Sequence, residues 1–439
     1  MPHIREEAER CLQCKKPRCR RGCPINNPIP QFIQMLKEGR IKEAGNLVFT
    51  NNPLSIVCSL VCPHERFCEG HCIKGIKSTP IHISSIEQYI ADYNLDMLDL
   101  YSSDEYEGKV GIIGGGPAGI AMAFFMARRG YEVTIYEASE RIGGIMRYGI
   151  PEFRLPGDHI DRLERQLRRL GVKIHPNSLI GPVTTVPDLF RDGFDALFMS
   201  TGVWKPNKMN VKGESLDNVH YAINYLRSPH LYNLGRDVVV IGAGNVAMDV
   251  ARTAIRSLHT LNVTILYRRG EEDMPCREEE YDYTKMDGVG FEFYTQVDEF
   301  CENGVWAHDT RDPAGEEKRR FIPCDSALVA ISQGPQSNVV STEPEIRLDR
   351  KGLVITDENM QTTMEGVYAS GDVVTGAKTV VEAVAAAKRC SNAMHNYIQR
   401  KKNPDWEDEV LYPADVLDMD MEKFKPREDA IAGSEDLLP

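Results

Sequence analysis

The chain has 439 residues, of which 42% are hydrophobic and 27% charged, and its formal net charge is −13. This composition is that of a folded protein of about two to four domains, and the negative charge disfavours nucleic acid as a general partner. No stretch approaches the roughly 18 consecutive apolar residues of a membrane span, and the N-terminal sequence MPHIREEAER lacks the apolar core of a secretory signal. We therefore expect a cytoplasmic protein with reduced cysteines.

The charge is unevenly distributed along the chain. Residues 403–439 contain 12 Asp or Glu against three Lys or Arg, whereas residues 1–23 contain seven Arg or Lys against three Glu. Such runs are compatible with ordinary solvated surface and also with docking of a partner or of the acidic tail on the N-terminal segment.

The N-terminal segment, residues 1–108, contains eight of the twelve cysteines. Within it, PIPQFIQMLKEGRIKEAGNLVF and ISSIEQYIADYNLDML place apolar residues at helical spacing. The segment is therefore predicted to be a domain of short helices wrapped around cysteine loops.

The cysteines of this segment form two runs of four. The first has the spacing C-x2-C-x4-C-x3-C followed by Pro24, and the second has the spacing C-x3-C-x5-C-x3-C. The first run is similar to ferredoxin patterns in which three cysteines wrap one cluster and the cysteine before proline reaches another. Zinc is the alternative, although zinc sites usually use two separated pairs. The spacing favours two 4Fe-4S clusters.

A strand, glycine turn and helix follow from Lys109. Gly114, Gly116 and Gly119 have the spacing of a dinucleotide-binding turn, in which backbone N–H groups and a helix N-terminus receive a pyrophosphate. Glu137 closes the next strand, where a carboxylate can accept hydrogen bonds from ribose hydroxyls. This pairing predicts a dinucleotide without a 2′-phosphate, and FAD fits.

A second such unit begins at Arg236, with Gly242, Gly244 and Ala247 in the turn. Here Arg268 and Arg269 replace the acidic residue, and guanidinium groups suit a 2′-phosphate. We therefore expect NADPH rather than NADH at this unit, with Arg277 as a further candidate contact. Two solvated arginines at a strand end remain the alternative.

The predicted fold class is α/β, with an N-terminal helical iron–sulfur domain and two doubly wound Rossmann-like domains, the second inserted in the first. A strand and turn in GVYASGDVV and a helix from Thr379 return the chain to the first domain. The expected bounds are 1–108 for the iron–sulfur domain, 109–230 with 332–402 for the FAD domain, 231–331 for the NADPH domain and 403–439 for the acidic tail.

Several motifs together carry a family resemblance: CLQCKKPRCRRGCP, VCPHERFCEGHC, IGGGPAGIA, RIGGIMRYGIPEFRLP, IGAGNVAMDVARTA and GVYASGDVVTGAKTVVEAV. Over residues from about 8 to 400 the chain resembles the small (beta) subunit of glutamate synthase. Its relatives include the N-terminal part of dihydropyrimidine dehydrogenase and the large subunit of the bifurcating NADH-dependent ferredoxin:NADP oxidoreductase.

The resemblance implies which residues hold the cofactors. The outer cluster would take Cys11, Cys14, Cys19 and Cys72, the inner cluster Cys23, Cys62, Cys68 and Glu87, and Cys58 would be a bystander. The FAD site would comprise Gly114, Gly116, Pro117, Ala118, Gly119, Glu137, Arg141, Gly144, Arg154, Gly371 and Asp372. The NADPH site would comprise Gly242, Gly244, Asn245, Val246, Ala247, Arg268 and Arg269.

The expected function is that of an NADPH-linked flavin and iron–sulfur subunit, which exchanges electrons with another redox subunit or ferredoxin in a hetero-oligomer. That complex could be of the glutamate synthase, pyrimidine-reducing or bifurcating type. Hydride and electron transfer need chiefly positioning, so no catalytic side chain is nominated. Two alternatives are a plain NAD(P)H flavoprotein with a zinc-stabilised N-terminal module and a flavin-binding scaffold that NADPH regulates.

Overall fold

The structure, a computed structural model, describes residues 4–101, 105–312 and 318–410. The chain divides into two compact units. The first comprises Met1–Met146, Arg154–Val203 and Pro335–Pro439, and the second comprises Arg147–Phe153 and Trp204–Gly334. The second unit thus interrupts the first, as the sequence predicts.

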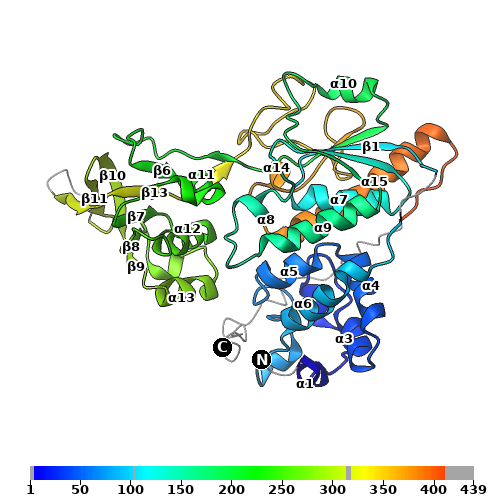
Figure 1. Cartoon of the computed structure of the whole chain (residues 1–439), viewed down its shortest axis with the longest axis horizontal. Coiled ribbons are helices and arrows are strands. Elements are labelled where there is room, and N and C mark those ends of the chain that lie inside the picture. Colours follow the sequence, from blue (N-terminus) through cyan, green and yellow to red (C-terminus); the bar gives the residue numbers. More distant parts are fainter. Residues whose placement is uncertain (1–3, 102–104, 313–317, 411–439) are drawn as a thin grey trace. The chain divides into compact units, whose positions relative to one another are not determined.

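Short helices make up the cysteine-rich segment of the first unit (Figure 1). Their bounds are α1 Ile4–Glu9, α2 Arg18–Gly22, α3 Ile29–Lys37, α4 Ile41–Asn51, α5 Ser55–Val61, η1 Ile73–Ile76, α6 Ile83–Asn94 and η2 Leu95–Met97. Phe32, Ile33 and Ile86 belong to the core between them. The long helical pattern of residues 28–49 is split into α3 and α4, because Gly39 adopts a φ of +77°.

The first unit contains a parallel sheet of order β15-β4-β1-β2-β3. Its strands are β1 Lys109–Ile113, β2 Glu132–Tyr136, β3 Lys173–His175, β4 Ala196–Met199 and β15 Val367–Ala369. The accompanying helices are α7 Pro117–Ala127, α8 Ile145–Tyr148 (which runs into the second unit), α9 Gly157–Arg169, α10 Val186–Arg191, α14 Asp372–Thr375 and α15 Val380–Lys402. Strand β15 completes this sheet after the chain has passed through the second unit.

The cysteine-rich helices pack on α7 and α15, which lie side by side (Figure 1). Phe49 of α4 meets Phe124 of α7 edge to face, with ring centroids 5.1 Å apart. Arg128, just after α7, donates a hydrogen bond of 3.1 Å to the Thr50 hydroxyl. The cysteine-rich segment and the first Rossmann-type sheet therefore share one compact unit.

The second unit repeats the arrangement with a parallel sheet of order β6-β13-β7-β8-β9. Its strands are β6 Val219–Tyr221, β7 Asp237–Ile241, β8 Asn262–Leu266, β9 Gly290–Glu292 and β13 Ser326–Val329. Its helices are α11 Ala222–Arg227, η3 Pro229–Leu231, α12 Asn245–Ile255, η4 Glu271–Asp273 and α13 Glu278–Met286. An antiparallel sheet of β10 Thr295–Cys301, β11 Gly304–Asp309 and β12 Arg320–Pro323 adjoins it in sequence, and β5 Lys205–Pro206 pairs with β14 Gln333–Gly334.

The expected α/β class with two Rossmann-type sheets is confirmed. Besides Arg147–Phe153, the second compact unit contains the continuous stretch Trp204–Gly334, which begins upstream of residue 231 and includes β6, the partner of β13 in the second sheet. The assignment of an FAD domain and an NADPH domain remains a prediction. Among the described residues, no helix is both long and apolar enough to cross a membrane.

Candidate cofactor sites

The first glycine turn connects β1 to α7. Gly114 has a φ of +102°, and a Cβ atom there would lie 2.7 Å from the Ser200 carbonyl oxygen. A Cβ atom at Gly119 would lie 2.0 Å from the Gly114 carbonyl oxygen, so both positions require glycine. At Gly116, which precedes α7, the nearest atom to such a Cβ is the Gly144 Cα, 3.9 Å away. The turn leaves space where a pyrophosphate would approach the helix N-terminus.

Glu137 follows β2 directly and is 7% exposed. Its Oε2 accepts a hydrogen bond from the Gly115 N–H at 2.8 Å, and its Oε1 accepts one from the Ser139 N–H at 2.7 Å. A carboxylate offers about four acceptor positions, so both oxygens can accept a further bond. The geometry fits a carboxylate that holds the glycine turn in place and can still accept hydrogen bonds from ribose hydroxyls.

Residues distant in sequence gather at this turn. Gly144 has a φ of +53°, and a Cβ atom on it would lie 2.7 Å from the Gly116 Cα. A Cβ atom on Gly371 would lie 3.3 Å from the Cβ of Ala118, which directly follows Pro117 at the start of α7. Asp372 starts α14, and burial raises the pKa of its carboxyl group to about 6. The structure thus unites most of the predicted FAD residues around one turn.

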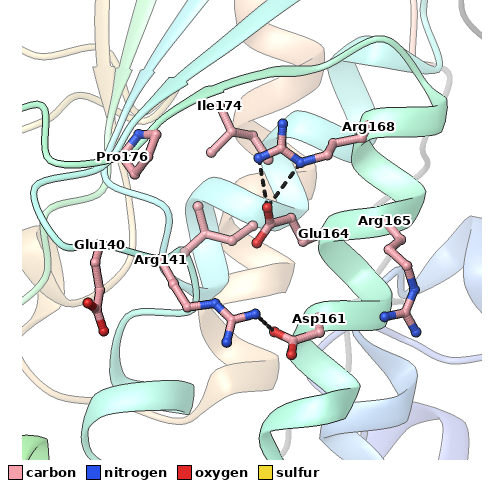
Figure 2. Close-up of a pocket in the computed structure, with 9 residues that line it drawn as sticks. Glu140, Arg141, Asp161, Glu164, Arg165, Arg168, Ile174 and Pro176 are labelled. Carbon is pink, nitrogen blue, oxygen red and sulfur yellow. Dashed lines mark hydrogen bonds and ion pairs between the residues drawn. The ribbon is translucent and has the colours of Figure 1, made fainter.

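Arg141 lies on a cavity of about 360 Å³ beside α9, also lined by Ile174 and Pro176 (Figure 2). Its guanidinium group pairs with Asp161 at 2.5 Å, and Arg168 pairs with Glu164 at 2.8 Å on the same helix. Arg154 is half-buried in the loop between α8 and α9. Whether these two arginines, Arg141 and Arg154, contact FAD remains a prediction.

The second glycine turn connects β7 to α12. Gly242 has a φ of +123°, and a Cβ atom there would lie 2.4 Å from the Ala330 carbonyl oxygen. At Gly244, immediately before Asn245 and Val246 of α12, no atom lies within 4 Å of such a Cβ. Ala247 is fully buried. This turn has the same open space for a pyrophosphate as the first.

Arg268 and Arg269 follow β8 and are exposed. Neither guanidinium group has a carboxylate partner within the part of the chain that the structure describes. Arg277 differs, because it is 5% exposed and pairs with Glu279 at 2.6 Å and Glu280 at 4.0 Å. Its charge is compensated inside the protein, so the two strand-end arginines are the better phosphate ligands.

Cys11, Cys14, Cys19 and Cys72 line one small hollow. Burial and the neighbouring thiols, Cys72 first among them, raise the pKa of the Cys19 thiol. Burial, followed by Cys72 and Cys14, also raises the pKa of the Cys11 thiol. The predicted outer ligand set is therefore brought together from both cysteine runs.

Cys23, Cys62, Cys68 and Glu87 form a second group. Burial raises the pKa of Cys23 to about 12, and the nearby Glu87 and Cys58 contribute to the rise. A contact with Cys58 and burial raise the pKa of Cys62. Burial also raises the pKa of Glu87 to about 8. Buried thiolates and a carboxylate need a cationic partner, which the iron of a cluster supplies.

Zinc, the alternative to a cluster, requires ligands that converge on one ion. Zinc–sulfur bonds of about 2.3 Å require thiolates that converge closely. Among the described residues, no three His, Cys, Asp or Glu side chains form a group that could hold one metal ion.

Three polar side chains, which form a chain of hydrogen bonds that ends at Glu87, were not predicted from the sequence. Lys388 Nζ donates to Asn51 Oδ1 at 2.6 Å, Asn51 Nδ2 donates to Asn27 Oδ1 at 3.2 Å, and Asn27 Nδ2 donates to Glu87 Oε1 at 3.0 Å. Asn27 and Lys388 are 1% and 3% exposed. The tripeptide Asn-Asn-Pro occurs at 26–28 and again at 51–53, which is the signal that could have indicated the two asparagines.

Comparison with known proteins agrees with this geometry. The family model of the pyridine nucleotide-disulphide oxidoreductases matches residues 108–387, more than half of the chain. The chain therefore belongs to the pyridine nucleotide-disulphide oxidoreductase family. A second model, dihydropyrimidine dehydrogenase domain II with a 4Fe-4S cluster, matches residues 2–98.

Relatives within the family match nearly the whole chain. The small chain of the NADPH glutamate synthase of Azospirillum brasilense is 33% identical over 433 residues, covering 90% of this chain and 89% of the relative. A subunit of the NAD-dependent dihydropyrimidine dehydrogenase of Salmonella typhimurium is 31% identical over 401 residues, covering 90% and 94%. The resemblance to the glutamate synthase small subunit is confirmed.

The fold is also similar to that of solved structures. Thioredoxin reductase of Lactococcus lactis superposes with a TM-score of 0.54 at 22% identity, over 67% of this chain and all of that chain. Family membership makes the protein an oxidoreductase and a flavoprotein that uses FAD and a pyridine nucleotide, with a 4Fe-4S segment at its N-terminus. The three cysteines of the second unit, Cys276, Cys301 and Cys324, form no C-x2-C pair, which disfavours the dithiol chemistry of thioredoxin reductases.

Proposed function

We propose that the protein is an NADPH-linked electron-transfer subunit of the cytoplasm. It relays electrons between NADP(H), FAD and two 4Fe-4S clusters, to or from a partner redox subunit or ferredoxin. The partner is proposed because the relatives named above are a small chain and a subunit of larger enzymes.

One observation carries this proposal. Two groups of cysteine thiols, one partly exposed and one largely buried, lie in the same compact unit that holds the first dinucleotide turn. Cys19 of the outer group and Cys23 of the inner group lie at opposite ends of α2, so the occupants of the two groups would be neighbours. This arrangement supports one electron path from the flavin site to the cluster segment.

The residues act chiefly by positioning. Glu137 and the two glycine turns would hold the ribose and pyrophosphate groups, and Arg268 and Arg269 would select the 2′-phosphate. When bound, the flavin accepts a hydride and the clusters carry single electrons. Burial of Cys62, Cys68 and Glu87 would shield the ligands of the inner set from water, whereas the outer thiols are partly exposed.

Anaerobic purification followed by metal and flavin analysis tests the composition. We expect about eight irons, the content of two cubanes, and about one FAD per chain. Cys14→Ser is expected to affect only the outer cluster and Glu87→Ala only the inner one. Stoichiometric zinc, or flavin without iron in protein never exposed to oxygen, would leave a plain NAD(P)H flavoprotein.

A further inference from the structure

Apolar side chains are exposed beside the outer cysteine group. Leu12 is 57% exposed, Ile73 37% and Ile76 49%. Leu12 and Ile73 line the hollow that Cys11, Cys14, Cys19 and Cys72 share, although the two residues come from different cysteine runs. The outer group thus lies under an apolar surface patch.

The same two loops are purely basic. Residues 10–37 contain seven Lys or Arg and residues 70–86 contain two, and neither stretch contains Asp or Glu. This is unusual in a chain whose net charge is −13. These two stretches therefore carry a net positive charge, opposite in sign to that of the whole chain.

Four of these lysine side chains have no carboxylate ion-pair partner among the described residues. Lys15, Lys16, Lys74 and Lys77 form no ion pair with any carboxylate in the described parts of the chain. Basic residues nearby do: Lys37 pairs with Glu9 at 3.1 Å, and Arg10 pairs with Glu7 at 2.7 Å. Unpaired lysines around exposed apolar residues have the layout of an interface, with a charged rim and an apolar centre.

We propose that Leu12, Lys15, Lys16, Ile73, Lys74, Ile76 and Lys77, here called the outer-cluster surface, dock a one-electron carrier protein with an acidic surface around its redox centre. This inference rests on the proposed function, because it takes the outer cysteine group to be the terminal cluster. Charge complementarity selects the partner, and the apolar centre excludes water between the two redox centres.

An acidic redox protein explains the surface better than nucleic acid or an anionic membrane. Both of these would also be attracted by lysine, but neither accounts for the position of the surface over a group of metal-ligating thiols. Oxidation of one NADPH releases a proton and two electrons, so each turnover reduces two one-electron carriers.

The test uses the full, cluster-loaded chain and an acidic 2Fe-2S ferredoxin as the acceptor. In the variant Lys15→Glu with Lys74→Glu, we expect the KM for ferredoxin to rise about tenfold or more and its salt dependence to weaken. Reduction of the flavin by NADPH should be unchanged. Lys351→Glu is the matched control, because Lys351 is exposed in a turn outside the cysteine-rich segment.

Leu12→Ser with Ile76→Ser tests the apolar centre separately and should lower ferredoxin reduction without changing its salt dependence. Equal ferredoxin kinetics in wild type and the Lys15/Lys74 variant would overturn the inference, as would an equal loss in Lys351→Glu. Binding to phosphatidylglycerol vesicles that depends on Lys15 and Lys74, with ferredoxin kinetics unaffected, would overturn it in favour of a membrane. Failure of NADPH to reduce the flavin would instead contradict the proposed function.

Discussion

Asp372 is the residue whose ionisation should be visible in cofactor binding. Burial raises the pKa of its carboxyl group to about 6, although its Oδ1 accepts a hydrogen bond from the Lys378 N–H at 3.1 Å. If the Asp372 carboxylate accepts a hydrogen bond from a hydroxyl group of FAD, then FAD binds to protein in which Asp372 is ionised. The affinity for FAD should then rise with pH through about 6 and be about tenfold weaker at pH 5, where about a tenth of the groups are ionised.

Fluorescence titration of the FAD-free protein between pH 5 and 8 checks this prediction. Asp372→Asn cannot ionise and should flatten the pH profile. A profile that persists unchanged in Asp372→Asn would show that another group is responsible.

Arg268 and Arg269 should decide the choice of nicotinamide cofactor. Replacing both by Ala is expected to raise the KM for NADPH about tenfold or more, with little effect on NADH, because only the 2′-phosphate is lost as a partner. Steady-state reduction of ferricyanide by each nucleotide measures the change. Arg236→Ala is the control, since Arg236 is exposed at the opposite end of β7. Equal losses with NADPH and NADH would contradict the assigned role.

At the scale of elements, α15, which packs against α7 in the first unit, is connected to the proposed inner cluster. All three hydrogen bonds of the chain Lys388–Asn51–Asn27–Glu87 donate toward Glu87. Aligned hydrogen bonds polarise one another, and Lys388 contributes a buried positive charge to the start of the chain. This chain holds one carboxylate oxygen of Glu87 and leaves Oε2 without a hydrogen-bond donor among the described residues.

Asn27→Ala or Lys388→Met should lower the midpoint potential of the inner cluster. Loss of the donor makes Glu87 a more basic ligand, and loss of the cation disfavours the added electron. The shift should be some tens of millivolts, since about 59 mV corresponds to a tenfold change in a one-electron equilibrium. Redox titration followed by low-temperature electron paramagnetic resonance measures it, and Lys388→Arg should restore much of the potential.

Gln88→Ala, one residue further along α6, is the matched control and should leave the signal unchanged. A Glu87→Gln variant separates the two possible failures. If Glu87→Gln alters the inner signal and Asn27→Ala does not, the ligand assignment stands and the hydrogen-bond chain has no part in it.

The strand, glycine turn and helix units could be predicted because the sequence motifs that specify them span only a few residues. The glycine turns after β1 and β7 require glycine for steric reasons that act within a few residues, so motif spacing was sufficient. The chain from Lys388 to Glu87 could not be predicted, because it joins residues that are distant in sequence and depends on packing of α15 against the cysteine-rich helices. The extent of the second unit was likewise not predicted, because it includes the pairing of β6 with β13, two strands that are distant in sequence.

At the scale of the molecule, the two units carry parallel sheets with the glycine strand in the middle of each. The cysteine-rich segment belongs to the unit of the first sheet. This organisation supports a division of labour in which the inserted unit binds the pyridine nucleotide and the first unit carries electrons onward. In this proposal, electrons from NADPH reach iron–sulfur clusters in the N-terminal segment.

Anaerobic mixing with NADPH, followed by absorbance and by electron paramagnetic resonance of frozen samples, detects this transfer. We expect loss of flavin absorbance together with a signal from a reduced 4Fe-4S cluster, and dithionite should reveal any cluster that NADPH cannot reduce. Cys14→Ser should remove the outer signal and retain flavin reduction. Flavin reduction by NADPH without a cluster signal under any reductant would contradict the account.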